Sequence, residues 1–450
     1  MLNYIWLGLM LCAVLIGGWN GQLKEISDAA LDMANTAVLK ISFALIGVMA
    51  LWLGIMRLAE RAGLVALLAR ALRPLMKIIF PEVPPEHPAM GSMLMNIAAN
   101  MLGLNNAATP LGLRAMKDLE SLNPRPGTAT NAMCTFLAIN TGGIQLIPVT
   151  AIAILAANQS TNPTAIVCTS LICTACAAVS GVLMATFLSR LPLFREKSAG
   201  GSPKSDASQR PLAAAATDEK LVVKEAATLQ PIPCWGKIIF DAFVLCFALF
   251  FLRLIVPELF GLPVSEAAAK QNIFIRSINA VSLLSIPLLL SAIPLFAMLR
   301  RVKVYEEFVD GAKEGFDVAI RIIPYLVAML VAVGMFRAAG GIDLLSRGLS
   351  PLLKLIGFPT DLLPMVLVRP LSGSGSLGFF TELVKQFGPD SLIARTAGTI
   401  YGSTETTFYV LAVYFGSVAI KRTRHALLAG LTADCVSVVM AVIVCRAVFG

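Results

Sequence analysis

The chain has 450 residues, of which 57% are hydrophobic and only 14% are charged. Ordinary soluble domains carry about a quarter charged residues, so this composition excludes a disordered, collagen-like or disulfide-rich secreted protein and argues against a soluble enzyme. Residues 126–189 contain no Asp, Glu, Lys or Arg. A helical crossing needs about 20 apolar residues, and such segments differ from the short alternating strands of a barrel. We therefore expect an all-α polytopic membrane protein.

The excess of 36 Lys and Arg over 27 Asp and Glu gives a net charge of +9. It lies mainly in loops and forms no Arg-rich runs, which is typical of the positive-inside bias of membrane proteins and not of nucleic-acid binding. The nine Cys are scattered, and the pair Cys173 and Cys176 has no second pair and no His nearby. We therefore expect neither a nucleic-acid partner nor a metal site.

The balance of apolar length and charge predicts about nine crossings. In chain order they lie near residues 3–18, 37–57, 132–157, 164–189, 238–256, 278–299, 317–336, 397–420 and 427–446. The first lacks a basic start and a cleavage site, so we expect it to be retained. Two more apolar stretches, 89–112 and 361–381, are interrupted by small and polar residues. Segments 58–80 and 338–356 predict amphipathic helices at the membrane surface.

A segment of mixed charge and low apolar content at 191–237 predicts a flexible cytoplasmic linker between two membrane halves. The expected domains are a first transmembrane helix with its outer loop at 1–30, repeat A at 31–190, the linker at 191–237, two connecting transmembrane helices at 238–311 and repeat B at 312–450. Basic residues follow the second and sixth crossings. The charge bias therefore predicts a cytoplasmic N-terminus and an external C-terminus.

Short motifs recur in the same order in both halves, which indicates an internal repeat. Residues 71–77 (ALRPLMK) match 348–354 (GLSPLLK), and 54–57 (GIMR) match 334–337 (GMFR). An odd number of crossings separates the two starts, so we expect two inverted-topology repeats, each with three crossings and a re-entrant hairpin. This plan is typical of secondary transporters, whose solute site lies where the repeats meet. A duplicated channel or scaffold is the alternative.

Each hairpin carries polar residues at membrane depth, where broken helices survive only inside protein or beside water. In repeat A, we expect Asn106 to Thr109 to cap a half-helix that has Pro110 in its first turn. In repeat B, residues 369–378 (RPLSGSGSLG) predict a second half-helix N-terminus, which together with Arg369 suits an anionic group. A plain helix crossing that is rich in Ser and Gly is the alternative reading.

The crossing after each hairpin is also broken, by residues 140–145 (NTGGIQ) in repeat A and 402–407 (GSTETT) in repeat B. Glu405 places a carboxylate at membrane depth, which predicts that it binds a coupling cation or carries a proton. A structural ion pair between Glu405 and Arg369 is the alternative. Asp434, inside the last crossing, is a weaker candidate for the same coupling role.

These patterns define the candidate sites. The candidate substrate-binding residues are Asn100, Asn105, Asn106, Thr109, Asn140, Thr141, Gln145, Arg369, Ser372, Ser374, Ser376, Ser403, Thr404 and Thr406. Glu405 and Asp434 are the candidates for ion or proton coupling. The sequence has two His and shows no HExxH, no P-loop and no Ser-His-acid set at depth, so we expect no catalytic residues, no enzymatic activity and no cofactor beyond H⁺ or Na⁺ as a coupling ion.

Residues 100–112 (NMLGLNNAATPLG) resemble spore maturation protein A, and residues 369–378 and 402–409 (GSTETTFY) resemble spore maturation protein B. The chain is thus similar to a fusion of the two, within the nucleoside recognition or gate-domain group of membrane proteins. This resemblance implies a multi-pass protein of the bacterial inner (plasma) membrane with re-entrant hairpins that moves a solute. It does not fix nucleosides as that solute.

The sequence as a whole predicts a secondary-type transporter or exporter of a small polar or anionic metabolite, either nucleoside-like or a carboxylate. Its expected partners are that solute and the lipid bilayer, with homo-oligomerisation left open. The competing prediction is a non-transporting inner-membrane factor that acts through protein partners in envelope or spore-maturation-like processes.

Overall fold

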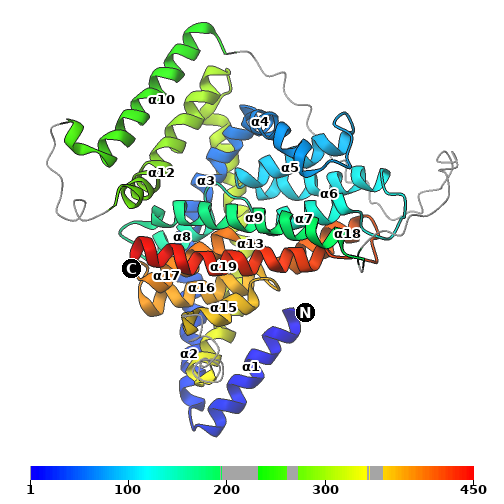
Figure 1. The fold of residues 1–450 in the computed structure, drawn as a ribbon. Helices are drawn as coiled ribbons and strands as arrows, with labels where there is room; N and C mark the ends of the chain where they lie inside the picture. The colour runs from blue at the N-terminus through cyan, green and yellow to red at the C-terminus, as the bar shows by residue number, and fades with distance from the viewer. Residues whose placement is uncertain (1, 193, 195–231, 261–271, 342–343, 345–357) are drawn as a thin grey trace.

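The computed structural model describes residues 2–192, 194, 232–260, 272–341, 344 and 358–450 (Figure 1). These residues form helices with short connections, and the one β-type pairing among them is an isolated bridge between Thr128 and Arg422. The expected helical architecture is therefore confirmed for this part of the chain. Most of the predicted linker lies outside the described residues.

The helices of the first half precede residue 191. In chain order they are α1 (Leu2–Trp19), α2 (Leu23–Asn35), a π-helical segment (Thr36–Ser42), α3 (Phe43–Arg61), α4 (Leu64–Ile79), α5 (Pro88–Met101), α6 (Asn105–Ser121), α7 (Asn131–Thr141), α8 (Val149–Ala157), a 3₁₀ turn (Pro163–Ala165) and α9 (Ile166–Arg190).

The second half continues from residue 234. It contains α10 (Cys234–Ile255), a 3₁₀ turn (Pro257–Phe260), α12 (Ile273–Leu299), α13 (Val304–Ala338), a 3₁₀ turn (Thr360–Leu362), α15 (Leu363–Val368), α16 (Gly373–Phe387), α17 (Leu392–Ser403), α18 (Thr407–Ser417) and α19 (Ala426–Phe449).

Four of these helical segments are long and apolar enough to cross a membrane. They are Pro163–Arg190, Cys234–Ile255, Ile273–Leu299 and Ala426–Phe449, and each coincides with one of the nine predicted crossings. Trp6–Trp19 is a shorter apolar helix in the region of the first predicted crossing. The protein is thus a helical membrane protein, and the full number of crossings stays a prediction.

Helices α3 and α13, which hold corresponding positions in the two predicted repeats, pack side by side in opposite directions (Figure 1). Arg57 lies near the end of α3, and its Nε donates a hydrogen bond of 2.9 Å to Oε2 of Glu307, which lies near the start of α13. Ala50 lies earlier on α3 and meets Gly315, which lies later on α13. A Cβ atom on Gly315 would lie 2.5 Å from the Cα of Ala50, so only glycine permits this close approach.

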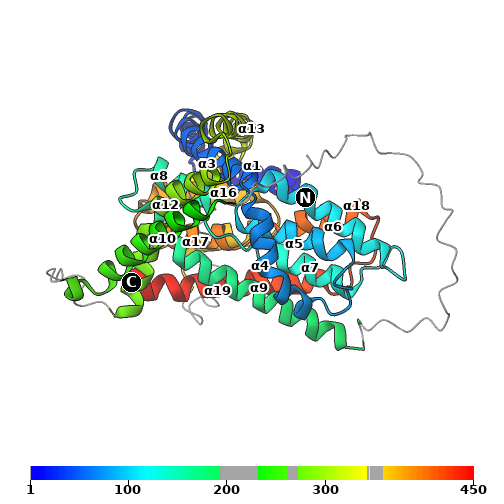
Figure 2. The ribbon, with the colours of Figure 1, turned by 90° about the horizontal axis from the view of Figure 1, so that it is seen from above.

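Helices α9 and α19, which likewise hold corresponding positions in the two predicted repeats, also pack in opposite directions. Gly181 of α9 lies against Ala433 of α19, and further along the chain Phe194 accepts a hydrogen bond from the guanidinium of Arg424, which precedes α19. Figures 1 and 2 together show that this pair runs across the direction of α3 and α13. The crossings predicted in α3 and α13 therefore run in a different direction from those predicted in α9 and α19.

Contacts between the two halves occur in reciprocal pairs. Helix α7 packs on α19 and helix α17 packs on α9, while α18 contacts α7 and α8 contacts α17. Reciprocal contacts of this kind are what two repeats would make, and the predicted inversion across the bilayer stays a prediction.

The first hairpin turns earlier than expected. Helix α5 ends at Met101, Gly103 has a left-handed φ of +73°, and α6 begins at Asn105 directly after Leu104. Pro110 therefore lies inside α6 and not in its first turn, and the expected cap at Asn106 to Thr109 is wrong. Because only glycine adopts this backbone conformation without strain, Gly103 sets the position of the turn.

The second hairpin begins its second helix where the sequence predicts. Ser372 is the N-cap of α16, and its hydroxyl accepts a hydrogen bond of 2.9 Å from the backbone N–H of Gly375. Helix α4 has a buried face with Val65, Ala69 and Met76 and an exposed opposite face, as the amphipathic pattern of 58–80 predicts. Residues 58–61 of that segment belong to α3, and most of the segment 338–356 lies outside the described residues.

Candidate functional site

Both predicted helix breaks are present. Residues 142–148 separate α7 from α8, and residues 404–406 separate α17 from α18. The hydroxyl of Thr174 on α9 donates to the carbonyls of Gly142 at 2.7 Å and Gly143 at 2.9 Å. The hydroxyl of Ser437 on α19 donates to the carbonyl of Ser403 at 3.3 Å. In each half, the last helix thus satisfies carbonyls that the break leaves without helical partners.

The two breaks touch each other. The backbone N–H of Glu405 donates to the carbonyl of Thr141 at 2.9 Å, and Nε2 of Gln145 donates to Oε1 of Glu405 at 3.2 Å. A Cβ atom on Gly143 would lie 3.0 Å from Cγ of Glu405. Residues far apart in sequence therefore form one junction between the halves.

A polar cavity of about 120 Å³ lies at this junction. Its lining comes from the first break and α8, from the tip of the second hairpin and from the second break. These residues are Gln145, Pro148, Thr150, Ala151, Arg369, Gly373, Tyr401, Gly402, Glu405 and Thr406. A cavity of this size has room for several water molecules. The predicted candidates Gln145, Arg369, Glu405 and Thr406 are thus brought together.

Arg369 is 4% exposed, and its guanidinium is fastened to the C-terminal end of α17. Its Nε donates to the hydroxyl of Thr404 at 3.0 Å, and its Nη2 donates to the carbonyls of Tyr401, at 3.0 Å, and of Thr404. The guanidinium also lies 4.5 Å from the centre of the Tyr401 ring. Its charge therefore compensates the carbonyls of a helix C-terminus.

Glu405 is not fixed by an ion pair in the part of the chain that the structure describes. None of the ion pairs there contains Glu405 or Arg369. The side chain is half-buried, lines the cavity and accepts a hydrogen bond from the amide of Gln145. Glu405 and Arg369 therefore line the same cavity without forming an ion pair in the described part of the chain.

A second polar cluster joins the first hairpin to α7 and α18. Nδ2 of Asn100 donates to Oδ1 of Asn140 at 2.9 Å, and the hydroxyl of Tyr414 donates to the same oxygen at 3.3 Å. Nδ2 of Asn96 lies 3.3 Å from that hydroxyl. Asn96 and Tyr414 are absent from the sequence-based candidates, although Asn96 lies in the polar stretch of the hairpin. A Cβ atom on Gly112 would lie 2.2 Å from the Tyr414 hydroxyl oxygen.

Several other candidates have local structural partners. Ser372 caps α16, its hydroxyl lies 3.4 Å from that of Ser374, and the Ser376 hydroxyl donates to the carbonyl of Gly373 at 2.9 Å. The Ser403 hydroxyl lies 2.8 Å from that of Ser437. The hydroxyls of Thr141 and Thr404 each donate to a carbonyl of the preceding helical turn, at 2.9 Å in both cases.

Thr109 from the first hairpin and Asp434 from the last helix do not line the polar cavity. Thr109 is half-buried on α6, and Asn105 and Asn106 begin that helix. Thr109 is not among the residues that line the cavity, and the side chains of the two Asn are outside the described part of the structure. Asp434 accepts a hydrogen bond from the hydroxyl of Thr407 and lines a different, apolar cavity.

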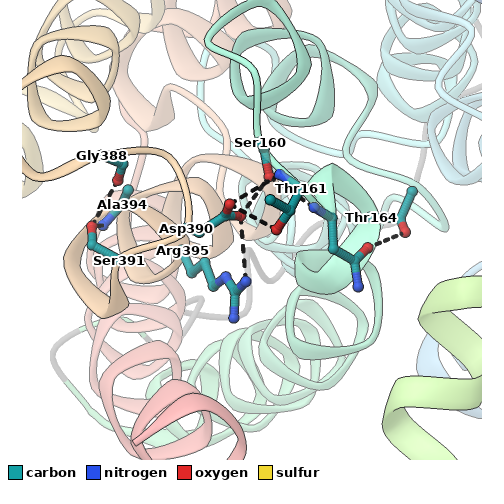
Figure 3. Close-up of polar contacts among 9 residues, drawn as sticks. Ser160, Thr161, Thr164, Gly388, Asp390, Ser391, Ala394 and Arg395 are labelled. Atoms are coloured by element: carbon teal, nitrogen blue, oxygen red, sulfur yellow. Dashed lines mark hydrogen bonds and ion pairs between the residues drawn. The ribbon is translucent and has the colours of Figure 1, made fainter.

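Two loop contacts tie the halves together away from the helix breaks. At the first, shown in Figure 3, Asp390 accepts hydrogen bonds from the backbone N–H of Thr161 at 2.9 Å, from its hydroxyl at 2.8 Å and from the Ser160 hydroxyl at 2.7 Å. Arg395 approaches the same carboxylate at 3.4 Å. Burial alone would raise the pKa of Asp390, but these hydrogen bonds outweigh it and hold the pKa well below 3.8.

The second loop contact joins the loop between α18 and α19 to the loop between α6 and α7. The backbone N–H groups of Lys421 and Arg422 donate to the carbonyl of Gly127 at 2.9 and 3.0 Å, and the N–H of Ala129 donates to the carbonyl of Arg422 at 3.0 Å. The α8–α9 loop thus meets the α16–α17 loop, and the α18–α19 loop meets the α6–α7 loop. Loops of the two halves thus contact each other at both places, one contact using a side chain and the other using the backbone.

Comparison with known proteins agrees with this organisation. A family model described as "Gate: Nucleoside recognition" matches residues 42–190 and 319–421. Spore maturation protein B of Bacillus subtilis is 46% identical over 173 residues, which cover 38% of this chain and 97% of that protein. Spore maturation protein A of the same organism is 41% identical over 184 residues, which cover 41% of this chain and 93% of that protein. No solved structure matches the chain.

Proposed function

The chain belongs to the nucleoside recognition (gate) family of membrane proteins, and from its site geometry we propose that it is a secondary transporter of a small polar solute. The observation that carries the proposal is the polar cavity at the contact between the two helix breaks. Interrupted helices at membrane depth are tolerated where they line a cavity. Transporters with inverted repeats bind their solutes at such interfaces.

The chemistry of the cavity favours a neutral polar or cationic group over an anion. Arg369 has donated its hydrogen bonds chiefly to the end of α17, which leaves little for an anionic solute. The Glu405 carboxylate and the hydroxyls of Thr150 and Thr406 line the same space and offer acceptors. We therefore favour the polar over the anionic class of metabolite that the sequence left open.

The volume of the polar cavity determines how far the two halves would have to move during transport. Sites for drug-sized ligands occupy about 300–1,000 Å³, and this cavity of about 120 Å³ is smaller. A nucleoside-sized solute would therefore require the two halves to separate at the breaks. Rocking of one repeat against the other provides such a movement and exposes the site to each side of the membrane in turn.

We assign coupling to Glu405, because a carboxylate at membrane depth without an ion-pair partner among the described residues can exchange H⁺ or bind Na⁺. Asp434 remains a second coupling candidate, at a separate cavity. The proposed location is the bacterial inner membrane, with the N-terminus in the cytoplasm. The gate family and the helical membrane fold favour a non-enzymatic role.

Ligand-dependent stabilisation tests this proposal. A ligand that binds only the folded state raises the melting temperature of the protein. The purified chain would be screened against nucleosides, amino acids, carboxylates and alkali cations, as wild type and as the Glu405→Gln variant. Glu60→Gln, an exposed position at the end of α3, is the matched control. We expect a polar solute or cation that stabilises the wild type and the control but not Glu405→Gln.

A screen in which every stabilising ligand acts equally on the wild type and on Glu405→Gln would contradict the proposed site. A screen without any stabilising ligand would favour the competing role as a non-transporting membrane factor.

A further inference from the structure

A second cavity of about 340 Å³ lies between the short helix α15 and the last helix α19. Leu363, Leu367, Val438 and Val439 form much of its wall, so most of its surface is apolar. Its volume is within the usual range for small-molecule sites of about 300–1,000 Å³. This cavity shares Arg369 with the polar cavity and contains Asp434, the second coupling candidate, while the proposed solute site lies in the polar cavity.

The mouth of this second cavity is lined by exposed, mostly apolar side chains. Leu367 is 52% exposed and Val439 is 50% exposed, and Cys435 beside them is exposed as well. Val439 and Cys435 lie on α19, one of the four helices that are long and apolar enough to span the membrane. Large apolar side chains on the outer surface of a spanning helix contact hydrocarbon. A ligand therefore reaches the cavity from the bilayer.

The inner end of the cavity is polar. Asp434 lines it and is only 5% exposed. One carboxylate oxygen, Oδ2, accepts a hydrogen bond from the Thr407 hydroxyl, while Oδ1 is buried and has no hydrogen-bond partner in the described residues. None of the ion pairs there contains Asp434. A buried carboxylate with an unsatisfied oxygen is costly, and a charged donor at this position offsets that cost.

Arg369 is near but does not supply that donor. Its Nε and Nη2 donate to Thr404 and Tyr401, as described above. The remaining nitrogen, Nη1, lies 3.5 Å from the Thr406 hydroxyl. The cavity thus combines an apolar wall with a buried carboxylate whose Oδ1 receives no hydrogen bond from Arg369 or from any other described residue.

We propose that this second cavity binds an amphiphile from the lipid phase, with its apolar chain along α15 and α19 and an ammonium head at Asp434. The apolar wall complements the chain. The carboxylate complements the head by charge and by hydrogen bonding, as intramembrane carboxylates usually do. The proposal goes beyond solute binding at the polar cavity, with which this site shares only Arg369, and binding of an amphiphile here does not require transport.

Photolabelling with two matched probes tests the site. The full chain in phosphatidylcholine nanodiscs is irradiated with octylammonium that carries a diazirine in its chain or with the corresponding octanoate, and labelled residues are identified by mass spectrometry. We expect several-fold more labelling of α15 and α19 by the ammonium probe than by the carboxylate probe. The exposed surface of α10 serves as an internal control for partition into lipid, and both probes should label it equally.

Two variants separate recognition of the head from filling of the cavity. Asp434→Asn keeps the shape of the side chain and should remove the preference for the ammonium probe at α15 and α19. Val438→Phe narrows the cavity without changing the carboxylate and should reduce labelling there by the ammonium probe. Labelling of α10 in each variant confirms that the protein is inserted. Equal labelling of the cavity by both probes, or an unchanged preference in Asp434→Asn, would overturn the proposal.

Discussion

The backbone N–H of Glu405 donates a 2.9 Å hydrogen bond to the carbonyl of Thr141. Thr141 is the last residue of α7, and Glu405 lies in the break between α17 and α18. This bond joins the interrupted helix of one half to the interrupted helix of the other, over 264 positions of sequence. The polar cavity lies beside it, so any movement of one half against the other changes the surroundings of Glu405.

A substitution at Gly402 tests whether the two helix breaks are in contact. A Cβ atom at Gly402 would lie 2.3 Å from Cβ of Pro148 in the other half. Gly402→Ala should therefore force the breaks apart and destabilise the protein by about 1–3 kcal/mol, the usual cost of overpacking. Gly416→Ala is the matched control, since Gly416 is also the penultimate residue of a half-helix and a Cβ atom there would have no neighbour within 4 Å. Thermal unfolding in detergent measures both, and equal melting temperatures would show that the breaks are not in contact.

Asp390 tests the loop contact drawn in Figure 3. Asp390→Asn removes the charge that accepts hydrogen bonds from Ser160 and Thr161, and should cost about 1–3 kcal/mol. Because the native pKa of Asp390 is lowered, its stabilisation is fully present above pH 3.8 and is lost as the pH falls below that value. Asp310→Asn, which changes an exposed carboxylate paired with Lys313 on the same helix, should have little effect. The midpoints of thermal unfolding at pH 6 measure this difference. An equal loss of stability in Asp390→Asn and Asp310→Asn would contradict this account.

His425 tests a separate dependence on pH. It is fully buried in the loop before α19, and neither ring nitrogen has a hydrogen-bond partner in the described residues. Burial, with a smaller effect of Arg424, lowers the pKa of His425 from 6.5 to about 4. The unfolded chain therefore binds a proton at a higher pH than the folded chain does, and stability is lost as the pH falls from about 6.5 to about 4.

The neutral variant His425→Gln removes this titration. We expect the melting temperature of the wild type to fall by several degrees more than that of His425→Gln between pH 7 and pH 4.5. If the melting temperatures of the two proteins fall equally between pH 7 and pH 4.5, the imidazole is protonated equally in the folded and unfolded states.

The local features of the fold could be predicted from the sequence. The glycine pair Gly142 and Gly143 and the hydroxyl-rich run at 402–407 weaken helices by their own conformational preferences, and both breaks lie where these residues predict. Ser372 caps a helix for an equally local reason. The sequence pattern misplaces the turn of the first hairpin because it gives Pro110 more weight than Gly103, whereas proline is tolerated inside α6 and the positive φ at 103 requires glycine.

Long-range partners could not be predicted. The sequence suggests that Arg369 attracts an anionic solute, but its donors reach the carbonyls of Tyr401 and Thr404, and the sequence does not reveal where those carbonyls lie. The Asn96–Tyr414 contact and the Asp390 loop contact join segments from different halves. Such contacts depend on how the helices pack, and a single sequence does not specify that packing.

Solute uptake by proteoliposomes tests the central claim most directly. Wild type, Glu405→Gln and the control Glu60→Gln would be reconstituted at equal density, and uptake of the stabilising solute would be followed under an imposed H⁺ or Na⁺ gradient. The account predicts gradient-driven uptake by the wild type and by Glu60→Gln, and none above empty liposomes by Glu405→Gln. Uptake by Glu405→Gln at the wild-type rate would contradict it.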